Sequence, residues 1–389
     1  MPLKEILKTI YAPHKAFREI IQNPRYIGPM LILILFCFTG AVSTYAYLTK
    51  TYYEQTMPKN RFEDPSQARV DEWTEDPALW HTSEGCVVKA NNMDYISGMN
   101  YGTNSIEFSA VNSAEMSAQL INIGPINCSN SGGYSKLYFR IKLTQPDFPP
   151  NGLWLYLYSS PTSYFCRNLI GEAKLTLNAW NNLTIALADG DWIQVGDADW
   201  TRINGLRIEL TWQNKSDLRI LLDGLFFGGV FKQAVDEATG YVTNSFAYTF
   251  MQFSIRWILL TGIIYVMCKA FKANISWRIT MVLIGFTLIT MFLQALANLA
   301  AFPITPNIKY SFEIIGGVNG EVKAAYAKLM EEVWFVNQLL SYAQAVFTVW
   351  SVALCAIAIR SMTEFSWSKS FLIAVVAYFA TITIEGFLI

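Results

Sequence analysis

The sequence predicts a bundle of five transmembrane helices with an all-β jelly-roll sandwich inserted between the first and second helices. The chain has 389 residues, of which 52% are hydrophobic and only 15% are charged. This composition is too apolar for an ordinary soluble protein. The apolar residues concentrate toward both ends, whereas the middle of the chain is polar and alternating. Together these observations indicate an integral membrane protein with one large polar domain.

The first span is expected at residues 28–48. No charged residue occurs from Tyr26 to Leu48, and about 20 apolar residues suffice for a helix to cross a bilayer. In lipid the backbone must satisfy its own hydrogen bonds, so this stretch must be helical. A cleaved signal peptide is the alternative. The basic segment before the span is long for a signal peptide and the small-residue site at 41–43 is weak, which favours an uncleaved anchor.

Residues 1–27 are expected to form a cytoplasmic amphipathic segment. Apolar residues recur at helical spacing on either side of Pro13, and basic residues occupy the opposite face. This pattern is typical of a helix that lies on a membrane surface. A solvated segment without membrane contact is the alternative.

Residues 61–229 are expected to form the sandwich, after a polar exit at 49–60. Apolar and polar residues alternate with a period of two at 137–143, 153–158 and 206–212, and turn residues separate these runs. Many short strands that each have one apolar face predict two packed sheets.

Residues 245–389 are expected to supply four more spans, at 247–268, 279–301, 334–359 and 370–389. The short loops at 269–278 and 360–369 are basic, as is the N-terminus. The excess of Lys and Arg places these segments in the cytoplasm. The sandwich, the loop at 302–333 and the C-terminus are then expected outside the cytoplasm.

The composition argues against several kinds of partner and chemistry. A net charge of −1 leaves no basic surface for nucleic acid. His14 and His81 lie far apart and no Cys-x-x-Cys occurs, so a zinc or haem site is not expected. No set of catalytic residues is recognisable, and we expect no enzymatic activity. Outside the cytoplasm, two of the three cysteines in the middle region could form a disulfide with one left over. These are Cys86, Cys128 and Cys166.

An aromatic stripe is the candidate ligand surface. The alternation at 153–158 turns three aromatic rings away from the core, and a second predicted strand turns further polar and aromatic groups to the same face. Flat rings beside hydrogen-bonding cations suit a sugar. The candidates are Trp154, Tyr156 and Tyr158 with Tyr138, Arg140 and Lys142. The alternative is that another segment, such as 70–82, covers the stripe.

Three further sets of polar residues carry predictions. Asn127, Asn182 and Asn214 begin N-glycosylation sequences in the exported domain. Arg256 and Glu385 lie within spans at similar depth, and we expect them to form an ion pair because a lone charge in a bilayer is costly. Independent extension of each side chain toward the interface is the alternative. Amides in the spans are expected to bond between helices or to line a path; they are Asn298, Asn337, Gln338 and Gln344.

The N-terminal sequence resembles the Yip (Ypt/Rab-interacting) family of membrane proteins. The resemblance rests on Pro13, Phe17, Asn23–Pro24 and Gly28–Pro29, and on the count of five spans. It implies a helical bundle, which in eukaryotes is linked to vesicle trafficking and GTPase partners. The chain departs from the family by its long insertion after the first span.

The insertion is similar to galactose-binding-like jelly rolls, the fold of many carbohydrate-binding modules. The similarity rests on residues 61–64, 180–187, 199–210 and 221–229. It implies a structural calcium ion at Glu63 and Asp223, since carboxylates and carbonyls are the usual ligands of calcium.

We therefore expect a non-enzymatic membrane protein that displays its sandwich to glycans or envelope proteins, in membrane organisation or trafficking. The alternative is a transporter or a subunit of an envelope complex, which a ligand-sized polar cavity in the bundle would favour. A glycan-modifying enzyme would require clustered carboxylates in a cleft of the sandwich.

Overall fold

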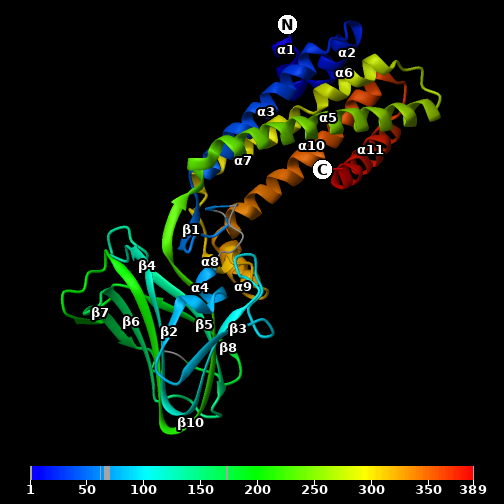
Figure 1. Cartoon of the computed structure of the whole chain (residues 1–389). Coiled ribbons are helices and arrows are strands. Elements are labelled where there is room, and N and C mark those ends of the chain that lie inside the picture. Colours follow the sequence, from blue (N-terminus) through cyan, green and yellow to red (C-terminus); the bar gives the residue numbers. More distant parts are fainter. Residues whose placement is uncertain (1, 62, 65–70, 172–173, 389) are drawn as a thin grey trace. The chain divides into compact units, whose positions relative to one another are not determined.

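The computed structural model describes residues 2–61, 63–64, 71–171 and 174–388. These residues form two compact units, which are described separately (Figure 1). The helical unit contains the chain up to Thr51 together with Gln233–Ile308 and the part from Met330 onward. The β unit contains Tyr52–Lys232 and Lys309–Leu329.

Among its described residues, the helical unit has five helical segments that are long and apolar enough to cross a membrane. They are α3 (Ile27–Leu48), α5 (Ala238–Ala270), the pair α6 (Trp277–Thr287) and α7 (Ile289–Ala300), α10 (Trp334–Met362) and α11 (Trp367–Leu388). The third segment is interrupted at Leu288, beside Thr287 and Thr290, whose hydroxyls donate to carbonyls three residues earlier. Such local bonds compete with the regular helical ladder. The predicted fold class, with five spans and an inserted β domain, is confirmed.

The N-terminal segment forms two helices, α1 (Pro2–Tyr11) and α2 (Pro13–Gln22). The break falls before Pro13, which has no N–H to continue a helix. Ile6, Phe17 and Ile20 are buried in one cluster with side chains of α3, α6 and α10. This corrects the prediction of a segment that lies only on the membrane surface: much of its apolar face is covered by protein. Leu3 and Leu7 remain exposed.

The described part of the β unit contains eleven strands, whose assigned pairings form one continuous network of neighbours. They are β1 (Thr51–Met57), β2 (Trp80–Thr82), β3 (Cys86–Asn91), β4 (Ser105–Ile126), β5 (Lys136–Gln145), β6 (Gly152–Ser160), β7 (Ser163–Asn168), β8 (Trp180–Ala186), β9 (Ile193–Val195), β10 (Ile203–Gln233) and β11 (Ile308–Tyr310). Three short helices accompany them: α4 (Glu72–Glu75), α8 (Phe312–Ile315) and α9 (Glu321–Glu332).

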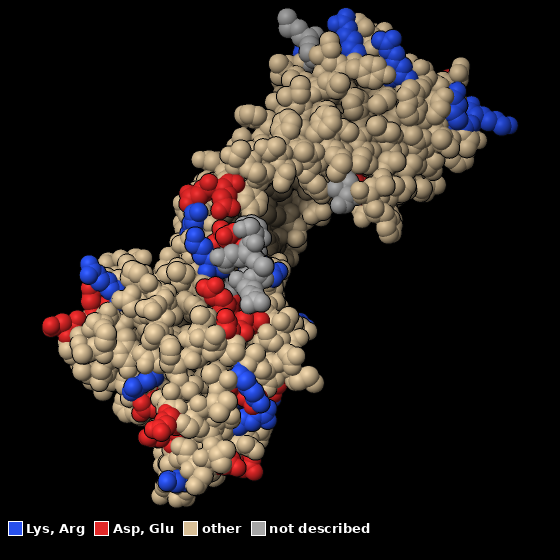
Figure 2. Space-filling model, in the orientation of Figure 1, with Lys and Arg blue, Asp and Glu red and all other residues tan. Residues whose placement is uncertain are grey.

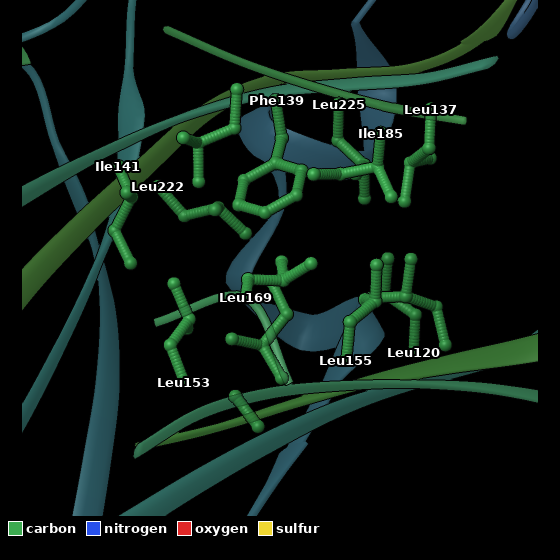
Figure 3. Close-up of a cluster of buried hydrophobic side chains, with 14 of the residues drawn as sticks. Leu120, Leu137, Phe139, Ile141, Leu153, Leu155, Leu169, Ile185, Leu222 and Leu225 are labelled. Carbon is green, nitrogen blue, oxygen red and sulfur yellow. The ribbon is translucent and has the colours of Figure 1, made fainter. Parts of the chain in front are cut away.

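The long strands β4 and β10 turn this network into a sandwich. They pair antiparallel with each other, with register shifts between Thr211 and Leu218. Before the shifts β10 pairs with β6, and after them it pairs with β5. The apolar faces of the two halves meet in one core, where Leu153 and Leu155 lie opposite Phe139 (Figure 3).

The β unit extends beyond the predicted 61–229. The expected polar exit contains β1, and part of the expected outer loop belongs to this unit through α8 and α9. Glu54 of β1 is buried and accepts hydrogen bonds from the Tyr138 hydroxyl at 2.8 Å and the Phe312 N–H at 2.7 Å. The Phe312 ring packs on Phe226 of β10.

The cysteines correct a second expectation. Cys86, Cys128 and Cys166 are free thiols, on β3, just after β4 and on β7 respectively. Burial raises the pKa of the Cys128 thiol to about 12, which keeps it protonated and unreactive at neutral pH. The middle region therefore relies on its apolar core and not on a disulfide.

Candidate functional site

Four aromatic rings lie together on the outer face of the sheet that contains β6 and β7. Trp154, Tyr156 and Tyr158 alternate on β6 with leucines of the core, and Tyr164 joins them from β7. Successive ring centroids along β6 are 6.5 and 6.4 Å apart, and Tyr158 and Tyr164 are 5.3 Å apart. All four side chains are partly exposed. We call these four residues the aromatic platform.

An ion pair on β10 flanks the aromatic platform. Arg207 lies opposite Tyr156 in the sheet and Glu209 lies opposite Trp154. The Arg207 guanidinium is 4.1 Å from the centre of the Tyr156 ring and donates to Glu209 at 2.9 Å. The guanidinium thus lies over the Tyr156 ring. Apolar rings next to charged hydrogen-bonding groups match the two kinds of surface that a sugar ring presents.

The second half of the predicted sugar surface lies elsewhere, and that prediction is wrong. β5, which carries Tyr138, Arg140 and Lys142, pairs with β8 and with the far half of β10, not with β6. Both β5 and β6 point their apolar residues into the same core. Their alternate residues therefore point outward from opposite sheets, and the two groups cannot contact one ligand.

Tyr138 and Arg140 are also covered. Each is only 5% exposed. Arg140 contacts the Tyr101 hydroxyl and donates to Glu321 of α9 at 2.5 Å. Lys142 is bonded to Asp94 at 2.6 Å. The outward face of β5 is thus covered by other segments, as the alternative expected for the stripe. The covering residues come from 94–101 and 312–321, not from the described residues of 70–82. In the described part of the 70–82 segment, Trp73 and Trp80 belong to the core.

Glu63 and Asp223 have separate hydrogen-bond partners in the structure, and calcium binding by them stays a prediction. One Glu63 oxygen accepts hydrogen bonds from the Thr56 and Asn60 N–H groups and from the Asn60 amide. Asp223 accepts one from the Ile96 N–H at 2.6 Å. The described residues contain no group of three or more acidic, histidine or cysteine side chains arranged to hold a metal. Residue 62, within the similarity at 61–64, lies outside the described residues.

Asp223 instead lies near a second buried aspartate. Asp71 accepts from the Gly102 N–H at 2.9 Å, while its other oxygen is buried without a hydrogen-bond partner among the described residues. Burial raises the pKa of Asp71 to about 7 and that of Asp223 to about 8. The charge of Glu75 further raises the pKa of Asp71, and the charge of Asp71 further raises that of Asp223. These carboxylates are in the interior, not in the open cleft that a glycan-modifying enzyme would require.

The three glycosylation candidates lie on the surface of the β unit. Asn127, Asn182 and Asn214 are all exposed. The Asn182 amide donates to Glu321 at 3.3 Å, whereas Asn214 lies in the β10 segment with the register shifts. Modification at these positions stays a prediction.

In the helical unit, the structure brings Arg256 of α5 and Glu385 of α11 together. The guanidinium donates two hydrogen bonds to the carboxylate, from Nε at 2.7 Å and from Nη2 at 2.8 Å. Glu385 is 6% exposed. The two-point contact joins α5 and α11, the second and fifth spans.

A polar cavity of about 560 Å³ lies beside this ion pair. Such a volume is within the range of small-molecule sites. Its wall includes Arg256, and α3, α5, α7, α10 and α11 all contribute to it. The Tyr47 hydroxyl of α3 donates to the Asn298 carbonyl of α7 at 3.0 Å, which fixes one side of the wall. Of the predicted amides, Asn298 and Gln344 line the cavity, whereas Asn337 and Gln338 are not among its lining residues.

Sequence reasoning missed Gln252, Gln294 and Tyr164. The two glutamines interrupt apolar runs of the second and third spans, and a polar amide in a span is itself a signal of function. Tyr164 continues the aromatic composition just after the stripe on β6, but only the pairing of β7 with β6 brings its ring to the platform.

Five candidate spans, an inserted antiparallel sandwich and a polar intramembrane cavity define a multi-span membrane protein with a large non-membrane domain. Residues 218–386, somewhat less than half of the chain, match the Yip1 domain. The predicted resemblance is confirmed, although the match lies beyond the N-terminal residues that suggested it. No curated protein matches the chain.

Solved structures similar to the chain include carbohydrate-binding modules. One is the family 11 module from Clostridium thermocellum in complex with a β-1,3-1,4-mixed-linked tetrasaccharide, at 15% identity and a TM-score of 0.27, covering 40% of this chain and 92% of the module. The family 30 module of a cellulosomal cellulase of Clostridium thermocellum has 8% identity and a TM-score of 0.32, with coverages of 41% and 96%. A β-1,2-glucanase from Parabacteroides distasonis has 14% identity and a TM-score of 0.30, with coverages of 41% and 25%.

Proposed function

We propose that this Yip1-domain protein displays its sandwich outside the cytoplasm, where the aromatic platform binds glycan chains. The observation that carries the proposal is the row of partly exposed rings on β6 and β7 beside the Arg207–Glu209 pair. The Trp154 indole N–H has no partner among the described residues, and the ring is only partly buried. It can therefore stack on a sugar ring and donate to a hydroxyl.

Replacing Trp154 by alanine should weaken binding to polysaccharides about tenfold or more, because the variant loses the stacking surface while the core stays intact. Binding of the full-length protein in detergent to an array of neutral polysaccharides measures this. Tyr95→Ala is the matched control, since Tyr95 is an exposed aromatic residue beside Asp94, which is bonded to the other sheet. Equal binding by wild type and Trp154→Ala, with unchanged thermal unfolding, would exclude the platform.

The proposed orientation rests on charge. Lys and Arg side chains gather at the end of the helical unit where α1 and α2 lie, and most of the remaining visible surface of this unit is uncharged (Figure 2). An excess of basic residues marks the cytoplasmic side. The sandwich follows the first span and the C-terminus follows the fifth, which supports the proposal that both lie on the opposite side from the N-terminus.

Cysteine labelling of intact cells tests this orientation. A membrane-impermeant thiol reagent should modify a cysteine at Lys215, which is exposed in the β unit, and should spare one at Ser276, exposed between α5 and α6. The background variant carries Cys86→Ser, because Cys86 is the one partly exposed thiol among the described residues. Labelling at position 276 but not at 215 would reverse the proposed topology.

A transporter or a subunit of an envelope complex is the second candidate function. The specific observation in its favour is the polar cavity of about 560 Å³ within the helical unit. A bundle that served only as an anchor would gain stability from filling such a space with apolar side chains. This candidate does not exclude glycan binding by the sandwich.

A further inference from the structure

The cavity of the helical unit is lined by several polar side chains that make no hydrogen bond to other described residues. Six of its polar lining residues have no side-chain hydrogen-bond partner in the part of the chain that the structure describes. They are Ser43, Gln252, Gln294, Asn298, Gln344 and Thr348. Within a bilayer, each unpaired polar group carries a substantial cost. None of their polar atoms is among the fully buried unpartnered ones, so these groups are accessible from the cavity and free to bond water or a polar ligand there.

The position of these residues along their helices places the occupant in one half of the membrane. Ser43 lies near the end of α3, Gln252 in the first half of α5 and Asn298 near the end of α7, while Gln344 lies in the first half of α10. Because successive spans run in opposite directions, these positions share one side of the bilayer. By the proposed topology this side is the outer leaflet.

The charge of the wall determines which kind of headgroup it favours. Arg256 is the one cation among the lining residues, and both hydrogen bonds that it donates go to the carboxylate of Glu385. The pair has no net charge, so it offers little attraction to an anion. What remains is a set of amides and hydroxyls, which both donate and accept hydrogen bonds. This set is complementary to a neutral headgroup rich in hydroxyls.

The surroundings of the cavity indicate that the occupant has an apolar part. Gln344 lines the cavity and is exposed on α10. Its neighbours Val346 and Val349 are among the most exposed apolar residues of this helix, at 63% and 70%. In a spanning helix such residues face lipid. Gln344, Val346 and Val349 point to different sides of α10, so most of the circumference of the helix is uncovered in this stretch. The cavity is thus open to lipid beside Gln344, and an occupant that enters there comes from the lipid phase.

We propose that the cavity binds the neutral, hydroxyl-rich headgroup of a membrane lipid, that is, a glycosylated lipid, with its acyl chains outside the wall. This inference deepens the second candidate function and is independent of glycan binding by the aromatic platform. The amides of Gln252 and Gln294 hydrogen-bond the headgroup hydroxyls from two different helices. The Arg256–Glu385 pair closes one side of the site.

Lipid co-purification tests the proposal. Full-length protein in detergent is incubated with phosphatidylcholine vesicles that contain monoglucosyl-diacylglycerol, phosphatidylglycerol or no added lipid, then purified again, and bound lipid is measured by mass spectrometry. We expect the glucosyl lipid to be retained above the phosphatidylcholine background, with phosphatidylglycerol at background. The double variant Gln252→Leu, Gln294→Leu should reduce retention on the order of tenfold or more, since two hydrogen-bonding groups are lost.

Two controls separate the possible results. Gln338→Leu removes an amide of α10 that is not among the lining residues, and it should retain the lipid like wild type. Trp154→Ala should also retain it, which distinguishes the cavity from sugar binding at the platform. Preferential retention of phosphatidylglycerol, no retention above background, or loss in Trp154→Ala but not in the double variant would each overturn the proposal. Thermal unfolding without added lipid shows whether each variant is folded.

Discussion

Replacing Arg256 by alanine should destabilise the helical unit by about 3–5 kcal/mol, the usual cost of leaving a buried charge without its partner. Glu385 is 6% exposed and its carboxylate has both oxygens bonded to Arg256. Once the guanidinium is removed, the structure offers this carboxylate no other cation in hydrogen-bond contact among the described residues. Unfolding of the full-length protein in mixed detergent micelles, followed by tryptophan fluorescence, measures the loss.

The charge-exchange variant shows whether the pair itself is responsible. Arg256→Glu combined with Glu385→Arg should recover much of the stability lost in either single variant, because the opposite charges again face each other. Arg18→Ala is the matched control: Arg18 is an exposed arginine of α2, and its removal should change the free energy of unfolding by less than about 0.5 kcal/mol. Arg256→Ala with the stability of wild type would contradict a structural role for the pair.

The stability of the β unit should fall as the pH rises from about 4 to about 8. An unfolded aspartate ionises near pH 3.8, whereas burial raises the native pKa of Asp71 to about 7 and that of Asp223 to about 8. Between these values the native state binds more protons than the unfolded state, so raising the pH favours unfolding. Each unit of pKa difference corresponds to about 1.4 kcal/mol, and the loss is on the order of several kcal/mol.

Asp71→Asn should flatten this pH dependence. The neutral amide can keep its oxygen toward the Gly102 N–H and place its NH₂ where the aspartate has an unpartnered oxygen. We therefore expect the variant to unfold like wild type near pH 4 and to be the more stable protein near pH 8. Urea unfolding of the full-length protein at both pH values measures the difference. Asp147→Asn, at an exposed aspartate, should leave the wild-type profile unchanged; a parallel profile for Asp71→Asn would refute the assignment.

Local patterns in the sequence determined the spans and the faces of most strands. An uncharged run such as Tyr26–Leu48 must be a spanning helix whatever surrounds it, because lipid offers its backbone no partners. The alternation of Leu153, Leu155 and Leu157 with aromatic residues likewise defines the core face of β6, since strand side chains alternate. The approach of Arg256 and Glu385 followed from depth in the membrane, which depends on position along each helix.

The tertiary structure decided which outward faces stay open and what the spans enclose. Arg140 alternates out of the core as Tyr156 does, yet Tyr101 and Glu321, far away in the sequence, cover it. β10 pairs first with β6 and then with β5, and the register shifts between these two parts cannot be predicted from a periodic pattern. Gln252 and Gln294 come together only because their helices surround one cavity. Periodicity specifies the direction of a side chain relative to its own helix or strand. Whether another segment covers that side chain, and which side chains line a common cavity, depends on contacts between distant segments.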